Sequence, residues 1–216
     1  LLLKGVPLHA GIAFMLTGPV INPIVLFSTY IAFGNRWDMV FYRAGLSFVI
    51  AIIIGMILSY QFKDNQLIPS ISKRSHNHVH HSSQSITKKF IGTLRHAVDE
   101  FFAVGKYLII GAFIAASMQT FIKTSTLLEV GQNEVSASLV MMGLAFVLSL
   151  CSEADAFIAS SFTSTFSQGS IVAFLVFGPM VDIKNTLMML GVFKKSFVLV
   201  LIVYIAILVL IGSLLI

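Results

Sequence analysis

The sequence predicts an all-α, polytopic membrane helix bundle. Hydrophobic residues make up 57% of the 216 residues, more apolar surface than a core of this size can hide from water. Charged residues make up 11%, against about a quarter in soluble domains. The apolar residues form continuous runs of helix-spanning length, not alternating ten-residue strands. Soluble globular, disordered and collagen-like proteins are therefore excluded, and the single cysteine, Cys151, excludes a disulfide scaffold.

Six apolar runs are long enough to cross a membrane as helices. They cover residues 11–33, 39–60, 101–122, 135–160, 170–193 and 196–216. Arg43 lies near the start of the second run, where its long side chain is expected to reach the membrane interface. The third run carries Lys106, the fourth becomes polar after Cys151, and the last contains no charged residue.

A hydrophilic segment, residues 62–100, separates the second and third runs. Its basic residues are Lys63, Lys73, Arg74, Lys88, Lys89 and Arg95. Basic residues concentrate in cytoplasmic loops, so the segment is predicted to be cytoplasmic, and its charge does not indicate nucleic-acid binding. Within it, residues 86–102 have the apolar spacing of an amphipathic helix lying at the membrane surface. With six crossings Lys4 is then also inside, and the basic residues expected outside are Arg36, Lys123, Lys194 and Lys195.

The same segment contains a dense group of histidines. They are His76, His78, His80 and His81. Neutral imidazoles bind zinc, nickel or copper readily, so these four are candidate metal ligands for buffering or sensing near a pore. The alternative is a solvated low-complexity loop, because the surrounding residues are rich in Ser, Asn and Gln and include no partner cysteine.

Two segments of the chain resemble each other at a constant offset. Residues 13–22 and 173–182 share Ala, Phe, Gly and Pro at equal positions and end in Asn22 and Asp182. We interpret them as an internal repeat, with residues 1–61 as the last two spans of one half and residues 101–216 as the four spans of the other. The complete protein is then expected to have eight spans, with its N-terminal part absent here. Because corresponding spans are four apart, both halves are expected to point the same way, related by an axis along the membrane normal.

Each copy of the repeat contains a glycine-proline pair inside its apolar run. The pairs are Gly18-Pro19 and Gly178-Pro179. Proline removes a helical hydrogen bond, so each pair is expected to break its helix, and a break in lipid must be buried or line a wet cavity. Asn22 with Pro23, and Asp182, fit the N-cap of a second half-helix whose exposed N–H groups could face a solute. The alternative is that both prolines are packing kinks.

A second polar cluster interrupts the fourth run. Glu153 and Asp155 would be expensive if they faced lipid, and in a regular helix they project to nearly opposite sides. The helix therefore either ends here at the interface or unwinds into a re-entrant segment that contacts a ligand. Cys151 lies four residues before Asp155, and a thiolate with nearby carboxylates could bind a thiophilic or transition metal ion.

Two lysines are candidate partners for the buried acids. Lys184 is two residues after Asp182, and the two side chains could pair if the helix is broken there. Lys106 on the third run could instead reach Glu153 or Asp155.

These residues carry a resemblance to a known family. The stretches LKGVPLHAG (residues 3–11), GPVINP (residues 18–23) and LCSEADAFIASSF (residues 150–162) resemble the bacterial YraQ-like predicted permeases, in their YcgR-type branch. The resemblance covers nearly the whole chain and implies two further spans and a cysteine-containing motif before Leu3. The same superfamily includes the methylated-arsenical efflux permeases, which implies a multi-pass protein of the bacterial plasma membrane.

The function predicted is a permease that exports a small ion or a metal- or metalloid-type solute, without cofactor or catalytic residues. The candidate solute-lining residues are Gly18, Pro19, Asn22, Cys151, Glu153, Asp155, Gly178, Pro179, Asp182 and Lys184. The chain has no Walker-type glycine-rich loop, so an ion gradient or a partner is expected to supply the energy. The alternative is a non-transporting membrane subunit that acts with a co-encoded partner. An intramembrane enzyme is disfavoured, because Cys151 lacks a helical histidine partner.

Overall fold

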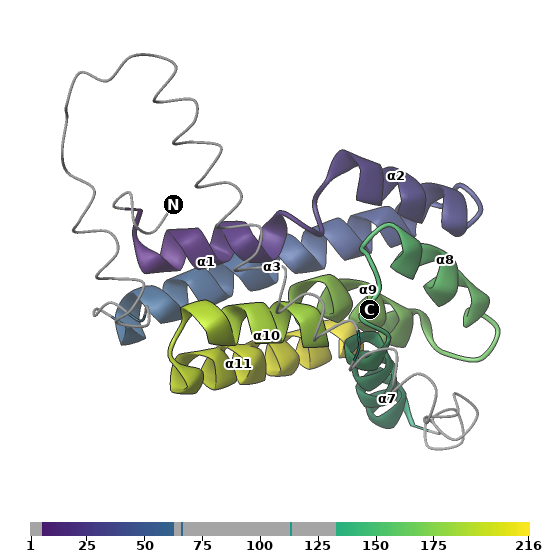
Figure 1. Ribbon diagram of the computed structural model, residues 1–216. Coiled ribbons are helices and arrows are strands. Elements are labelled where there is room, and N and C mark those ends of the chain that lie inside the picture. The colour runs from purple at the N-terminus through teal and green to yellow at the C-terminus, as the bar shows by residue number, and fades with distance from the viewer. Residues whose placement is uncertain (1–5, 63–65, 67–112, 114–132) are drawn as a thin grey trace, which may run out of the picture.

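The computed structural model of the protein describes residues 6–62, 66, 113 and 133–216. Within these ranges every secondary-structure element is a helix, as predicted. The helices are α1 (Leu8–Thr17), α2 (Pro23–Ala32), α3 (Trp37–Gln61), α7 (Glu134–Leu148), α8 (Ala154–Ser161), α9 (Gln168–Met180), α10 (Ile183–Val192) and α11 (Lys195–Leu214) (Figure 1). The predicted span at 101–122, the amphipathic helix at 86–102, Lys106 and the four histidines lie outside the described residues.

Three described stretches are long and apolar enough to cross a membrane. They are Trp37–Gln61, Gln168–Val192 and Lys195–Leu214. The second of these contains α9 and α10, and α9 forms the centre of the bundle. Eleven of the 13 residues of α9 are buried, and α3, α7, α8 and α11 all pack against it. The continuous apolar sequence of α9 fits this position, because a helix apolar on all sides must be covered on all sides.

The first predicted run is broken, as expected from its sequence. α1 ends at Thr17, and Gly18 follows as its C-cap. α2 begins at Pro23, and Asn22 is its N-cap, with its side chain accepting a hydrogen bond from the Ile24 amide at 3.0 Å. Proline at the first helical position lacks only an N–H that would have no helical partner, so it favours a helix start here.

The second break lies later than its sequence suggested. Pro179 is inside α9, which continues to Met180, so the expected break at Gly178-Pro179 is wrong by a few residues. α10 starts after Asp182, whose side chain accepts from the Asn185 amide and caps the helix. Gly178 has a packing role instead, because a Cβ there would lie 3.3 Å from the Cβ of Ala145 on α7.

The fourth predicted run does not form one helix. α7 stops at Leu148, and Ser149 takes a left-handed conformation with φ of 47°. Residues 149–153, which we call the α7–α8 linker, then lead into the short helix α8. The sequence left a helix end and an unwound re-entrant segment open, and the chain unwinds.

The contacts between helices fix their directions. Gln168 at the start of α9 donates a hydrogen bond to Met39 Sδ near the start of α3, so these two helices run the same way. The amide of Lys194, before α11, donates to the carbonyl of Gln66, beyond the end of α3, at 3.0 Å. A Cβ on Gly55 in α3 would lie 3.5 Å from Ala13 in α1. Both α1 and α11 therefore run opposite to α3 and α9 (Figure 1).

α7 and α8 form a hairpin that enters and leaves at one end of the bundle. α7 lies parallel to α9, because Ser138 on α7 donates to Ser170 near the start of α9, and Ser149 at its end donates to Asp182 beyond the end of α9. α8 must then return the chain to the start of α9 (Figure 1). The run at 135–160 is therefore a hairpin of two helices and not one continuous helix.

The expectation that matching segments point the same way is therefore wrong. α1 and α9 hold the two similar sequences and run in opposite directions, as do α3 and α11. The reason is that the prediction treats the run at 135–160 as one full span, whereas this run forms the α7–α8 hairpin and returns to the end where it began. Lys194 and Lys195 consequently lie at the end where α3 finishes, beside the start of the basic segment, and not on the opposite side.

A group of buried serines joins three helices at the other end of α9. We call Ser138 (α7), Ser170 (α9) and Ser213 (α11) the serine cluster. Ser213 Oγ donates to Ser138 Oγ at 3.2 Å, and Ser138 Oγ donates to Ser170 Oγ at 3.4 Å. Beside it, a Cβ on Gly169 would lie only 2.1 Å from the carbonyl oxygen of Ser213. Small residues let the backbones of α9 and α11 approach closely, as at many membrane helix crossings.

Candidate functional site

Arg43 lies in the interior of the bundle. Its side chain is 0% exposed, so the expectation that it reaches the membrane interface is wrong. It lies six residues into α3, or about 9 Å along the axis at the usual rise of a helix. Polar partners from two other helices take the place of interfacial water.

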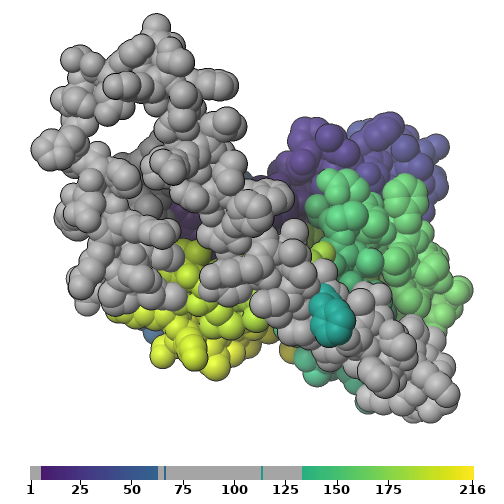
Figure 2. Space-filling view, viewed as in Figure 1, coloured from purple at the N-terminus to yellow at the C-terminus, as the bar shows by residue number. Residues whose placement is uncertain are grey.

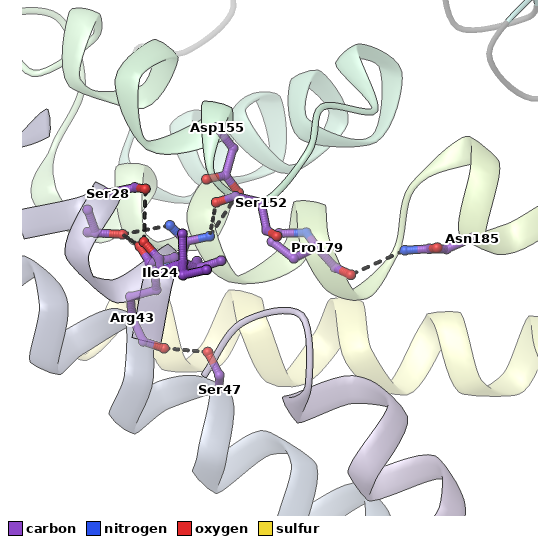
Figure 3. A network of polar contacts seen from close by, with 10 residues as sticks. Ile24, Ser28, Arg43, Ser47, Ser152, Asp155, Pro179 and Asn185 are labelled. Carbon is purple, nitrogen blue, oxygen red and sulfur yellow. Dashed lines mark hydrogen bonds and ion pairs between the residues drawn. The ribbon is translucent and has the colours of Figure 1, made fainter. Parts of the chain in front are cut away.

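The guanidinium of Arg43 connects α3 to α2 and to the α7–α8 hairpin (Figure 3). Nη1 donates to Thr29 Oγ1 at 2.7 Å. Nη2 donates to the carbonyl of Ser152 at 3.0 Å and forms an ion pair with Asp155 Oδ2, also at 3.0 Å. Asp155 is in the first turn of α8, where a carboxylate also interacts favourably with the helix dipole.

This buried ion pair is not fully satisfied. Arg43 Nε and Asp155 Oδ1 are both buried, and neither has a hydrogen-bond partner. A buried pair offsets the cost of desolvating two charges only when the geometry is good and the remaining polar atoms are bonded. The pair is therefore poorly explained as a device for stability.

Asp182 forms the other end of the polar site. Its carboxylate accepts from the Ser149 hydroxyl at 3.0 Å as well as from the Asn185 amide. The Asn185 side chain in turn donates to the carbonyl of Pro179 at 3.2 Å, across the break between α9 and α10. The expected pairing of Asp182 with Lys184 is not formed, because the carboxylate is turned toward the linker and its own helix.

The α7–α8 linker joins these two groups. Its first residue, Ser149, bonds Asp182, and Ser152 with the adjacent Asp155 bonds Arg43. We call the residues so connected the linker cluster: Thr29, Arg43, Ser149, Ser152, Asp155 and Asp182. In the part of the chain that the structure describes, all three buried charged residues belong to it. α8 packs against α2, and Figure 2 shows the green surface of the α8 region beside the purple surface of the α2 region.

The remaining predicted residues are distributed unevenly around the cluster. Cys151 is exposed and Glu153 is partly buried, so neither joins Asp155 in the buried site. No group of three possible metal ligands occurs among the described residues, and the suggested Cys151–Asp155 metal site is not formed there. Asn22 and Pro19 are half-buried and Gly18 is exposed, whereas Pro179 is buried.

A separate pocket lies at the end of the bundle where α3 and α9 begin. Its volume is about 230 Å³. It is lined by Phe33, Arg36, Met39, Thr163, Phe166, Gln168 and Ile171. Arg36 forms an exposed ion pair with Asp38 beside it. The pocket does not include any of the predicted site residues.

Sequence reasoning missed Arg43, Thr29 and Ser149. A signal existed for Arg43, because a charged residue within a span usually faces the bundle interior and marks a functional site. Ser149 carried no such signal, because its role depends on a left-handed backbone conformation that a serine in the sequence does not predict. Thr29 is buried and bonds its own helix at Val25, so its sequence context is that of any helical threonine.

Comparison with known proteins identifies the family. Residues 1–216 match the sequence profile of ArsP_1, a family described as predicted permeases. The chain belongs to this permease family. It is 73% identical over 215 residues to the UPF0718 protein YcgR of Bacillus subtilis (strain 168), an alignment that covers 100% of this chain and 72% of that protein. No solved structure matches the chain.

A second relative carries a more specific description. It is a Streptococcus mutans protein described as a candidate subunit of a two-component membrane permease complex, 48% identical over 196 residues. The alignment covers 91% of this chain and 64% of the relative. The family and its apolar helices make this chain a membrane protein and indicate a transporter. The two alignments bear out the predicted resemblance.

Proposed function

We propose that this chain forms the solute path of a multi-pass permease in the bacterial plasma membrane, and that the path passes the linker cluster. The observation that carries the proposal is the convergence of Arg43, Asp155 and Asp182 on one unwound segment. Charged residues inside a membrane are costly, rare and usually functional. Irregular backbone at membrane depth is tolerated where it is buried in protein or lines a wet cavity, which is how transporters build substrate sites.

The opposed directions of the two similar segments support the proposal. The amide of Ile21 donates to the carbonyl of Thr17, and the amide of Val181 donates to that of Phe177, at 2.8 Å in both copies. Each residue of the second bond is 160 positions after its counterpart. Because α1 and α9 run in opposite directions, we infer a repeat of inverted topology, with its axis in the membrane plane. Transporters of this construction place substrate sites at discontinuous helices near the midplane.

Orientation offers a test of the inverted arrangement. Single cysteines at Ser83 and Lys195 are expected on the cytoplasmic side, and one at Arg36 on the outside, because basic residues favour the cytoplasm. An impermeant maleimide added to intact cells should label only the Arg36→Cys variant. Labelling of Lys195→Cys together with Arg36→Cys would contradict the opposed directions of α3 and α11.

We further propose that the solute is a small ion of metal or metalloid type and that transport is outward. Support comes from the family resemblance and from the four histidines of residues 62–100. A strain without the gene should then be more sensitive to at least one member of a panel of metal and metalloid salts. Equal tolerance across the whole panel would refute this solute class, leaving the proposed path to be tested with other solutes.

Variants test whether the linker cluster lines the path. In the sensitive strain, the wild-type gene should restore tolerance, whereas Asp182→Asn and Asp155→Asn should not, although both proteins reach the membrane at normal levels. Ser213→Ala is the matched control, since it removes a buried hydroxyl from the serine cluster and should restore tolerance fully. Normal tolerance with both aspartate variants would place the path elsewhere.

A second candidate function is a subunit that works with a co-encoded membrane partner. The description of the Streptococcus mutans relative favours it. If the chain needs a partner, tolerance should require the neighbouring gene, and the two products should copurify from mild detergent. Tolerance restored by this gene alone in a strain lacking both would contradict the two-subunit proposal.

A further inference from the structure

The α7–α8 linker is attached at both ends to helices from different parts of the chain. At one end Ser149 donates to Asp182, the N-cap of α10. At the other end the Ser152 carbonyl and Asp155 accept from Arg43, which belongs to α3. Any displacement of the linker as a whole must therefore break contacts to both α3 and the start of α10.

Several features make the linker suited to a second position. Ser149 has φ of 47°, a left-handed conformation that is unfavourable for any residue with a Cβ. Strained backbone of this kind is found at switch regions and persists only when its surroundings hold it. The ion pair at the other end leaves Arg43 Nε and Asp155 Oδ1 without hydrogen-bond partners. Breaking it would therefore cost less free energy than breaking a fully hydrogen-bonded pair. The rest of the hairpin is anchored by packing, with α7 lying along α9 and α8 against α2 and α9.

We propose that the α7–α8 linker is a gate across the solute path, and that Ser149 and Arg43 are positioning residues that hold it closed. The gate opens by moving as one unit with the start of α8, which breaks the Ser149–Asp182 and Arg43–Asp155 contacts together. The gating role rests on the proposed transport function. The movement itself needs no solute, so it can be tested in the purified protein whether or not the solute class is correct.

A cysteine at a buried position in the first turn of α8 would report the movement. Ala156 follows Asp155 in α8 and is 0% exposed, so Ala156→Cys, made in a Cys151→Ser background, should react slowly with maleimide while the gate is closed. Ala173 in α9 is also 0% exposed and provides the matched static reporter, Ala173→Cys. The Cys151→Ser protein without either reporter gives the background rate for the full-length protein in nanodiscs.

Each contact should contribute separately to the labelling rate of Ala156→Cys. Ser149→Ala removes the hydrogen bond to the Asp182 carboxylate and should raise the rate about 10-fold. Asp155→Asn removes the charge that pairs with Arg43 and should raise the rate about 10-fold or more. Because the gate moves as one unit, the double variant should show the product of the two effects, about 100-fold or more. Ala173→Cys should stay slow throughout.

Two results would overturn the proposal. Unchanged labelling of Ala156→Cys in both single variants would mean that the contacts do not hold the linker. A double variant no faster than the faster single variant would mean that the two ends move separately. If Asp155→Asn also speeds Ala173→Cys, it has loosened the whole bundle. Thr29→Val then takes its place with the same expectation of a multiplied effect, because it keeps both charges and removes the hydroxyl that positions Arg43, together with that hydroxyl's bond to the Val25 carbonyl.

Discussion

Two buried polar regions occur in the described part of the bundle, and they are built differently. The serine cluster is neutral, joins α7, α9 and α11 where the backbones are closest, and its three hydroxyls bond one another. The linker cluster carries three buried charges, lies where helices are broken, and leaves two polar atoms without partners. The first arrangement resembles the polar contacts that hold membrane helices together. The second has costs that packing alone does not explain.

The comparison teaches where to look for function in this permease family. A hydroxyl cluster can be replaced by small apolar residues at modest cost, because neutral hydrogen bonds contribute about 0.5–1.5 kcal/mol each. A buried charge cannot be left alone without a larger penalty. A chain under selection for stability alone has no reason to keep Arg43, Asp155 and Asp182 in the interior. Substitutions in the serine cluster should therefore each lower the free energy of unfolding slightly. A substitution in the linker cluster should lower it strongly when it leaves a buried charge without its partner.

The largest effect should come from leaving Arg43 without its partner. Asp155→Ala should lower the free energy of unfolding by about 3–5 kcal/mol, because a buried charge is then uncompensated. Denaturation of the purified protein in mixed micelles, followed by circular dichroism, would measure it. A loss below about 1 kcal/mol would mean that Arg43 finds water after all, and the two clusters would not differ as described.

Close packing at the serine cluster should give the next largest effect. Gly169→Ala would bring a methyl group into the carbonyl of Ser213, and overpacking of this kind usually costs about 1–3 kcal/mol. Gly143→Ala in α7 is the control, because nothing lies within 4 Å of the added Cβ. That variant should be unchanged or more stable by up to about 1 kcal/mol, since alanine favours helix. Equal thermal stability of the two variants would contradict the close approach of α9 and α11.

The smallest effects should distinguish hydroxyls in the two regions. Ser213→Ala removes a hydrogen bond between hydroxyls and should cost about 0.5–1.5 kcal/mol, whereas Ser149→Ala removes one to a carboxylate and should cost about 1.5 kcal/mol or slightly more. Ser149→Gly should be more stable than Ser149→Ala by up to about 1 kcal/mol, because glycine takes the left-handed conformation without strain. Differential scanning fluorimetry of the three variants checks this order. A Ser149→Gly protein less stable than Ser149→Ala would argue against the left-handed turn.

Local features of the fold could be predicted from the sequence, whereas the global directions could not. The break before Asn22 follows from a cap residue and a proline that act within four residues of each other. Asp182 caps α10 for the same local reason, although Pro179 proved compatible with the last turn of α9. The direction of each half depends on whether the run at 135–160 crosses or returns, and an apolar hairpin has the same composition as an apolar span.

The site was predicted in part for a related reason. Asp155 and Asp182 were recognisable because acids are rare in apolar runs. The prediction for Arg43 is wrong because its position near the start of an apolar run suggested an interface, while its partner Asp155 is 112 residues away in sequence. Pairings of that separation depend on helix packing, which no local pattern specifies. The metal site suggested for Cys151 and Asp155 stays a prediction; in the structure Cys151 is exposed, whereas Asp155 pairs with Arg43.

The central claim is that the charges of the linker cluster serve transport and not stability. The measurement that tests it most directly is the double substitution Arg43→Met with Asp155→Leu, assayed for unfolding and for restored tolerance in the strain lacking the gene. Replacing a buried ion pair by apolar residues of similar size is often neutral or stabilising by about 1–4 kcal/mol. We predict a double variant at least as stable as the wild type that reaches the membrane and restores no tolerance. A stable double variant that restores tolerance fully would contradict the claim.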